Sequence, residues 1–274
     1  MLDPMDGAMR DEAYEHYARG LEWDRLTSPL GEVEFTRTQR IVLRHLPPSP
    51  ALVADVGGGP GRYTLWLASL GYQVRHRDLV RSHVAHVATE ADGAAVETAV
   101  GDARRLDLAD GSVDAVLLLG PLYHLEDRDD RVLALTEAGR VVRPGGFVFA
   151  AAISRWAPRL DGILVGRIHE KYPDAIREVS QAERDGVLPA LGPGSFCGYT
   201  HRPAELTSEV RAAGLDLIDL AGVEGLAFAL PGLPGLLRDP AQRAIVLDSA
   251  EAVERVPELL GLSPHLLATA QRKN

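Results

Sequence analysis

The segment with the clearest chemistry is a glycine-rich loop headed by a carboxylate, Asp55-Val56-Gly57-Gly58-Gly59-Pro60-Gly61. Glycines permit backbone torsions that are closed to other residues, and they let a ligand lie against the main chain. The helix expected to follow the loop offers unpaired N–H groups at its first turn. A tight turn alone needs one or two glycines rather than four. The segment is therefore predicted to bind a ligand.

The spacing of this loop distinguishes two classes of cofactor. A dinucleotide-binding loop has the pattern G-x-G-x-x-G. Counted from Gly57, the last position of that pattern is Arg62, and counted from Gly59 it is Thr64, so neither register fits. The observed pattern is Asp-x-Gly-x-Gly-x-Gly. The carboxylate of Asp55 would repel a pyrophosphate and attract a cationic amine.

Three further motifs stand at the ends of strand-like segments. Asp78 can accept two hydrogen bonds from a ribose diol. Asp102 could accept a hydrogen bond from an adenine amino group, and the Ala103 N–H could donate to a ring nitrogen. The fourth motif, Leu119-Gly120-Pro121-Leu122-Tyr123-His124-Leu125, leaves the next strand-like segment.

His124 is the candidate general base, because an imidazole suits proton transfer near neutral pH. Tyr123 could orient a reacting molecule. A base is needed only if the nucleophile carries a proton that must leave, so a wall role without proton transfer stays open for His124. No close pair of carboxylates or histidine cluster in the sequence demands a metal, and no metal site is predicted.

The elements that must position these motifs alternate in type. Helical spacing of apolar residues is found around residues 63–70, 80–87 and 127–142. This rhythm predicts an α/β fold with a doubly wound, mostly parallel seven-stranded sheet. Ligands of such sheets bind outside the carboxyl ends of the strands, so the four motifs should converge on one crevice. The expected strands are residues 52–56, 72–78, 95–102, 113–120, 147–153, 215–223 and 265–272.

Two kinds of added segment are expected around this sheet. Residues 1–46 should form an N-terminal helical cap, and residues 47–274 the core. The alternation breaks over about 155–200 and 225–260, which are predicted to be lid insertions, the first of them after strand five. An acceptor pocket under these lids could have aromatic walls formed by Trp156, Tyr172, Phe196, Tyr199 and Phe228. An apolar lid with aromatic residues suits a small, partly hydrophobic acceptor.

The amino-acid composition limits the classes of binding partner and the cellular locations that are expected. The net charge is −10, and no long run of lysine and arginine is present, so no nucleic-acid partner is expected. The single cysteine, Cys197, cannot form an internal disulfide or a multi-cysteine metal site. The N-terminus lacks the apolar region of a signal peptide, and no apolar run of about 20 residues occurs. A cytoplasmic protein without a membrane span is the expectation.

Taken together, the motifs resemble those of the class I S-adenosylmethionine-dependent methyltransferases over about residues 50–153. DVGGGPG resembles the first motif of that family, Asp78 its ribose-binding acid and GDA its adenine-contact segment. RVVRPGGFVF is similar to the turn and fifth strand that follow a helix in these enzymes. These motifs are specific for the cofactor, S-adenosyl-L-methionine, and not for the methyl acceptor.

The resemblance implies roles for individual residues. The backbone of the glycine loop would contact the methionine moiety, Asp55 would orient the loop or the amino group, and Leu119 would lie near the amino acid or the sulfonium. Arg25 could pair with the methionine carboxylate, although a surface charge on an amphipathic helix explains it equally well. The full set of cofactor-binding candidates is Tyr17, Arg25, Asp55, Gly57, Gly58, Gly59, Gly61, Asp78, Leu79, Asp102, Ala103 and Leu119.

The implied reaction is methyl transfer to a small molecule through an oxygen, nitrogen or carbon nucleophile, by in-line displacement that yields S-adenosylhomocysteine. A methyltransferase acting on RNA or protein is the first alternative. A protein that binds S-adenosylmethionine without catalysis is the second.

Overall fold

A computed structural model describes residues 25–192 and 196–274 of the chain. The predicted parallel sheet is confirmed, with its first five strands in the order β3-β2-β1-β4-β5. Strand β9 runs antiparallel to β5, and β8 runs antiparallel to β9, which completes the seven predicted strands. Their bounds are β1 Leu52–Val56, β2 Gln73–Asp78, β3 Val96–Val100, β4 Val113–Leu118, β5 Val142–Ser154, β8 Asp216–Gly222 and β9 His265–Gln271.

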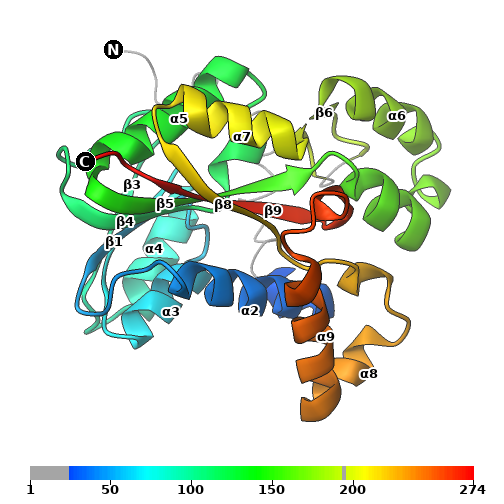
Figure 1. Cartoon of the computed structure of the whole chain (residues 1–274), viewed down its shortest axis with the longest axis horizontal. Helices are drawn as coiled ribbons and strands as arrows, with labels where there is room; N and C mark the ends of the chain where they lie inside the picture. The colour runs from blue at the N-terminus through cyan, green and yellow to red at the C-terminus, as the bar shows by residue number, and fades with distance from the viewer. Residues whose placement is uncertain (1–24, 193–195) are drawn as a thin grey trace.

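Helices cover both faces of the sheet (Figure 1). Helices α2, α3 and α4 lie on one face, and α5 and α7 lie on the other. Strand β4 is apolar and buried on both sides, because Val116 and Leu118 enter one core while Ala115 and Leu117 enter the other. The helices are α2 Pro29–Leu43, α3 Arg62–Ser69, α4 Arg81–Glu90, α5 Arg128–Val141 and α7 Pro203–Ala212.

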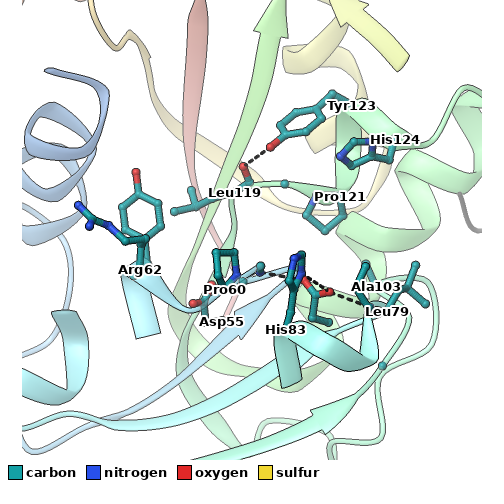
Figure 2. A pocket seen from close by; sticks show the side chains of 18 of the residues that line it. Asp55, Pro60, Arg62, Leu79, His83, Ala103, Leu119, Pro121, Tyr123 and His124 are labelled. Carbon is teal, nitrogen blue, oxygen red and sulfur yellow. Dashed lines mark hydrogen bonds and ion pairs between the residues drawn. The ribbon is translucent and has the colours of Figure 1, made fainter. Parts of the chain in front are cut away.

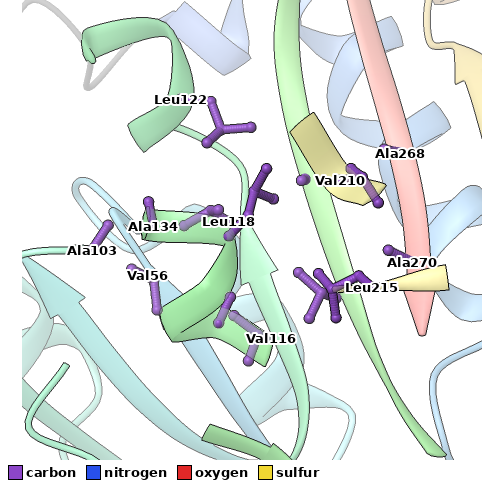
Figure 3. Close-up of a cluster of buried hydrophobic side chains, with 14 of the residues drawn as sticks. Val56, Ala103, Val116, Leu118, Leu122, Ala134, Val210, Leu215, Ala268 and Ala270 are labelled. Carbon is purple, nitrogen blue, oxygen red and sulfur yellow. The ribbon is translucent and has the colours of Figure 1, made fainter. Parts of the chain in front are cut away.

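The core between the sheet and α5 and α7 also fixes two of the predicted ligand-binding loops. Ala103 and Leu122 lie in the same buried cluster as Val116 and Leu118 of the sheet (Figure 3). Apolar contacts of this kind hold the base of each loop, while the residues beside them stay free to face a ligand. The loops that follow β3 and β4 are therefore extensions of the packed core.

The segment between β5 and α7, predicted as a lid, contains more regular structure than expected. It includes two short strands that the sequence analysis did not predict. Strand β7 pairs in parallel with the end of β5, and β6 pairs antiparallel with β7, which extends the described sheet to nine strands. The elements are a π-helix Pro158–Val165, a 3-10 helix Ile168–Glu170, α6 Ala175–Asp185, β6 Val187–Leu188 and β7 Gly198–His201.

The range 225–260, predicted as a second and irregular lid insertion, is largely helical. It holds a 3-10 helix Ala227–Ala229, α8 Leu233–Arg238 and α9 Pro240–Val253. Asp239 caps α9 by accepting from the N–H groups of Ala241 and Gln242. Arg37 of α2, fully buried, pairs with Glu251 and Glu254 at the end of α9. The aspartate and proline at the start of α9 are a helix-start signal, which is present in the sequence of the segment predicted as a lid.

The described part of the predicted N-terminal cap consists of a 3-10 helix, Arg25–Thr27, and α2. Residues 1–24 lie outside the described residues. Within the described ranges, no helix is long and apolar enough to span a membrane.

Candidate functional site

The carboxyl ends of β1, β2, β3 and β4 border one crevice of about 960 Å³, part of which is open to solvent. Figure 2 shows loops from these strands facing one another across it. The structure thus brings together the four motifs that the sequence placed at strand ends. The predicted residues that line the crevice are Asp55, Gly57, Gly58, Gly59, Asp78, Leu79, Asp102, Ala103, Leu119, Tyr123 and His124.

The glycine loop needs its glycines for two different reasons. A Cβ on Gly57 would lie 2.6 Å from Cγ of Pro121, and a Cβ on Gly58 would lie 2.6 Å from Cδ2 of His76, so both are packed against neighbours. Gly59 has φ +56°, and no described atom lies within 4 Å of the position of its Cβ. Gly59 therefore leaves the space above the loop open for a ligand. Gly61, with φ +86°, is the N-cap of α3, and it is absent from the described crevice lining, because it packs against α4, where a Cβ would lie 2.5 Å from Cγ2 of Val87.

Asp55 is buried, and only one of its carboxylate oxygens is satisfied. Thr64 Oγ1 donates to Oδ2 at 2.6 Å, whereas Oδ1 has no hydrogen-bond partner among the described residues. Burial raises the pKa of Asp55, and the nearby His76 opposes this effect. A buried acceptor oxygen without a donor fits a cationic amino group, which would stabilise the ionised carboxylate.

Asp78 connects the glycine loop to the start of α4. Gly59 N–H donates to its Oδ2 at 2.8 Å, and Val80 N–H donates to its Oδ1 at 2.8 Å. His83 Nδ1 lies 3.2 Å from Oδ1. Burial raises the pKa of Asp78, but the hydrogen bonds from His83, Val80 and Gly59 outweigh it, and the net pKa is lowered. The carboxylate is thus ionised and can still accept from a ribose diol.

The motif at the end of β3 contributes Ala103 and Asp102 to the crevice. Ala103 is buried at the crevice wall. The carboxylate of Asp102 is already engaged, since Arg104 donates to it from Nη2 at 2.8 Å and from its backbone N–H at 2.9 Å. A further bond from an adenine amino group would use its remaining lone pairs.

Tyr123 and His124 lie in a 3-10 turn, Pro121–His124, directly after β4. The Tyr123 hydroxyl donates to the Leu119 carbonyl at 3.3 Å, and the ring of His124 lies 4.7 Å from the ring of Tyr123. Phe196 packs against both rings, at 5.9 and 6.0 Å between centroids. In Figure 2 both side chains face Pro121 and the glycine loop across the crevice.

Some predicted residues are not brought to this site by the described structure. Tyr17 lies outside the described residues, and the side chain of Arg25 is outside them as well. Of the aromatic residues expected to form an acceptor wall, Phe196 reaches the Tyr123–His124 turn. The described crevice lining does not include Trp156, Tyr172, Tyr199 or Phe228.

Arg62 is a charged residue that lines the crevice and was not among the predicted site residues. Its guanidinium carbon lies 4.8 Å from the centroid of the Phe35 ring, a cation–π distance. The signal that could have found it is its position directly after the last glycine of the loop, at the first turn of α3. It places a positive charge in the part of the crevice that also holds Tyr63 and Leu26.

A second group of polar residues, unrecognised in the sequence, gathers away from the crevice lining. Glu34, Glu224 and His265 offer ligand atoms within 4.8 Å of one another, an arrangement that could hold a metal ion. The ring nitrogen Nδ1 of His265 forms a short hydrogen bond with Glu224. The backbone N–H of His265 also donates to Glu224, at 3.0 Å. These two bonds fasten the first residue of β9 to Glu224, two residues beyond the end of β8.

Comparisons with known proteins agree with this geometry. Residues 54–150 match a family model described as a methyltransferase domain. A ubiquinone biosynthesis O-methyltransferase of Burkholderia thailandensis is 31% identical over 174 residues, which are 62% of this chain and 67% of that relative.

Solved structures share the fold. A SAM-dependent methyltransferase of Methanosarcina mazei has a TM-score of 0.59 at 18% identity, covering 85% of this chain and 97% of that one. The 1,6-didemethyltoxoflavin N1-methyltransferase of Burkholderia thailandensis, solved with 1,6-didemethyltoxoflavin and S-adenosylhomocysteine, has a TM-score of 0.56 at 18% identity. It covers 95% of this chain, which covers 85% of it.

Proposed function

Because this chain belongs to the class I S-adenosylmethionine-dependent methyltransferases, we propose that it methylates a small molecule bound beside Tyr123 and His124. One observation carries the proposal. The turn that bears these two side chains lines the same crevice as the glycine loop and Asp78. A cofactor held by the loop therefore shares one enclosed space with an imidazole and a phenol, the groups that can orient or deprotonate an acceptor.

In this proposal the cofactor lies along the four strand ends. Asp55 Oδ1 accepts from the methionine amino group, and the open face of Gly59, with Gly57, Gly58 and Gly61, supports the methionine chain. Asp78 accepts from the ribose hydroxyls. Leu79, Asp102 and Ala103 surround the adenine, and Leu119 lies near the sulfonium. The methionine carboxylate takes a positive partner, either Arg25, as predicted from the sequence, or Arg62, and Tyr17 covers the cofactor.

The cofactor, when bound, supplies a methyl group on a positively charged sulfur that leaves as the neutral thioether of S-adenosylhomocysteine. The chain contributes approach geometry and an enclosed site. Transfer of this methyl group to the acceptor atom would be an in-line displacement, with S-adenosylhomocysteine as the leaving group. His124 takes the proton that an oxygen or nitrogen acceptor must lose, and Tyr123 orients that acceptor.

An oxygen acceptor is the favoured kind. The Burkholderia thailandensis relative is named as an O-methyltransferase of ubiquinone biosynthesis. A hydroxyl nucleophile also gives His124 a proton to remove. The net charge of −10 favours a small molecule over a nucleic acid as the acceptor.

The test is a labelling experiment with S-adenosylmethionine whose methyl group carries deuterium. The purified protein is incubated with this compound and a bacterial extract, which is then separated into small-molecule, RNA and protein fractions. We expect the label in a small molecule, with equimolar S-adenosylhomocysteine, and no label with the Gly59→Val variant. Label in the RNA or protein fraction alone, or no S-adenosylhomocysteine above background, contradicts the proposal.

A further inference from the structure

One buried arginine, Arg131, donates hydrogen bonds to the backbone just after the turn that carries Tyr123 and His124. Arg131 of α5 is 1% exposed, and its Nη1 donates to the carbonyl oxygens of Leu125 at 2.9 Å and Glu126 at 2.7 Å. Leu125 itself lines the crevice. A single guanidinium group thus binds the two peptide carbonyls that directly follow His124, and it fixes where the turn ends.

Arg131 is in turn held by residues from the far part of the chain. Its other edge binds Glu209 of α7, from Nη2 at 2.7 Å and from Nε at 3.0 Å, and this pair is buried on both sides. The ring of Tyr199 of β7 lies 3.6 Å from the guanidinium carbon, and His201 Nε2 lies 3.2 Å from Glu209. A planar group bound on two edges and stacked on one face has little freedom to move.

Strand β7 also supports the turn directly. A Cβ on Gly198 would overlap the carbonyl oxygen of Tyr123, so the β7 backbone touches the turn at that point. Strand β7 is anchored to the core by Arg155, which donates to the Thr200 carbonyl at 2.9 Å and to Glu205 of α7 at 2.6 Å. The segment inserted after β5 and the turn after β4 are therefore one connected unit.

We propose that Arg131 is a positioning residue for methyl transfer: through Leu125 and Glu126 it holds Tyr123 and His124 against the crevice. The inference rests on the function proposed for that turn. Glu209 and Tyr199 act through Arg131, since they contact its guanidinium. The hydrogen bonds of this group do not reach Asp55, the glycine loop or Asp78 in the described ranges, so cofactor binding should be independent of it.

Arg140 provides a matched control on the same helix. It donates to the carbonyls of Leu106 at 3.0 Å and Leu108 at 2.9 Å and binds Glu137 through two nitrogens, a similar pattern of bonds, and it also binds Asp110 at 2.6 Å. Arg140 holds residues 106–110 of the loop after β3, which are absent from the described crevice lining, whereas Asp102 and Ala103 at the start of that loop line the crevice. Arg140→Met therefore removes a similar arginine without touching the turn.

The experiment compares Arg131→Met with Arg140→Met in three measurements that need no acceptor. For Arg131→Met we expect at least tenfold faster hydrogen exchange over residues 121–126, a shifted NMR signal of the His124 ring, and an S-adenosylhomocysteine affinity within about threefold of the wild type. Arg140→Met should leave the hydrogen exchange over residues 121–126 and the His124 signal unchanged. With an acceptor in hand, Arg131→Met should lower kcat at least tenfold with little change in cofactor KM.

Two further variants test the inference in case the Arg131→Met protein does not fold. Arg131→Lys keeps the charge but cannot bind both carbonyls and Glu209 at once, so its exchange rate over 121–126 should fall between the wild type and Arg131→Met. Gly198→Ala should displace the turn from the β7 side and shift the same His124 signal.

Unchanged exchange and an unchanged His124 signal in Arg131→Lys, in a folded protein, overturn the inference. A failure of the proposed function looks different. In that case no acceptor is methylated, while the exchange and NMR effects of Arg131 persist.

Discussion

Different interactions shape the two halves of the crevice. Around β1 and β2, the glycine loop is held by the Gly59 N–H bond to Asp78, across 19 positions, and by a bond from Gly57 N–H to the Arg77 carbonyl at 2.7 Å. Around the turn after β4, the decisive bond joins Arg131 to Glu209, across 78 positions. The first half uses backbone geometry and a neighbouring strand, whereas the second uses side chains from α5, α7 and β7.

In the proposed function this difference separates the tasks of the two halves: the half around β1 and β2 would hold the cofactor, and the half around the turn after β4 would hold the acceptor. The cofactor half is formed by the sheet itself, so its shape follows from the strands and from a few glycines. The acceptor half is formed by a turn whose position depends on a buried ion pair and on an inserted segment. Substitutions in α7 or β7 could thus reshape the acceptor site while the cofactor site stays intact, which is how one fold can serve many acceptors.

The largest effect is expected from His124→Ala, which tests the acceptor half. If His124 removes a proton, kcat for an oxygen acceptor should fall roughly 10²–10⁴-fold, and cofactor affinity should barely change. Steady-state kinetics and calorimetry with S-adenosylhomocysteine measure the two quantities. A fall in kcat of less than about tenfold, with a raised KM for the acceptor, would show that His124 only shapes the wall.

Gly59→Val tests the cofactor half with the next largest effect. The branched side chain would fill the space that Gly59 leaves open, and overpacking of about 3 kcal/mol corresponds to a loss of roughly 100-fold in cofactor affinity. Gly93→Val is the control, because Gly93 also has a positive φ, +76°, and open space at its Cβ position. Both variants bear the same backbone strain, so equal affinities in the two would mean that the loop does not cradle the cofactor.

Asp78→Ala should have a smaller effect in the same half. Loss of hydrogen bonds to a charged group costs about 1–3 kcal/mol, or roughly 5- to 150-fold in affinity for S-adenosylhomocysteine. Since the pKa of Asp78 is lowered, wild-type affinity should stay level from pH 8 down to about pH 5 as far as this group is concerned. Calorimetry across that range measures both effects, and an affinity unaltered by the substitution would remove Asp78 from the ribose role.

The smallest effect concerns stability in the acceptor half. Burial lowers the pKa of His201 below its usual value, although Glu209 favours the charged form. The unfolded chain therefore binds a proton near pH 6.5 that the folded chain does not, so stability is present above that pH and is lost as the pH falls. Between pH 7.5 and 5.5 the loss should be at most about 1.4 kcal/mol, or a few degrees in Tm.

The control for this effect is His201→Asn, whose Tm should depend less steeply on pH over the same window. The pKa of Glu209 is lowered as well, so that carboxylate titrates below the window and does not confuse the result. An identical slope in the two proteins would mean that His201 is protonated in the fold.

The strand positions and the glycine loop could be predicted because their signals are local. Alternating apolar segments define β1 to β5, and the loop needs torsions that only glycine adopts freely, as the positive φ of Gly59 shows. The α9 helix was missed because its start at Asp239 and Pro240 lies in a stretch that was interpreted as a lid.

The contacts of Arg131 with Glu209 and Tyr199, which support the turn after β4, could not be predicted from one sequence. Nothing near Arg131 in the chain indicates Glu209 or Tyr199 as its partners, since the fold brings them together through α7 and β7. Arg62 carries a local signal but no indication that it faces the crevice rather than solvent. Pairing between side chains that are far apart in the sequence depends on how the helices and strands pack. The spacing of apolar residues along the chain does not indicate that packing.

The most direct test of the account is a crystal structure of the protein with S-adenosylhomocysteine. The account predicts ribose hydroxyls on the carboxylate of Asp78, the methionine amino group on Oδ1 of Asp55, and a sulfur atom that faces the turn of Tyr123 and His124. A ribose that contacts neither oxygen of Asp78, or a sulfur that faces away from that turn, would contradict it.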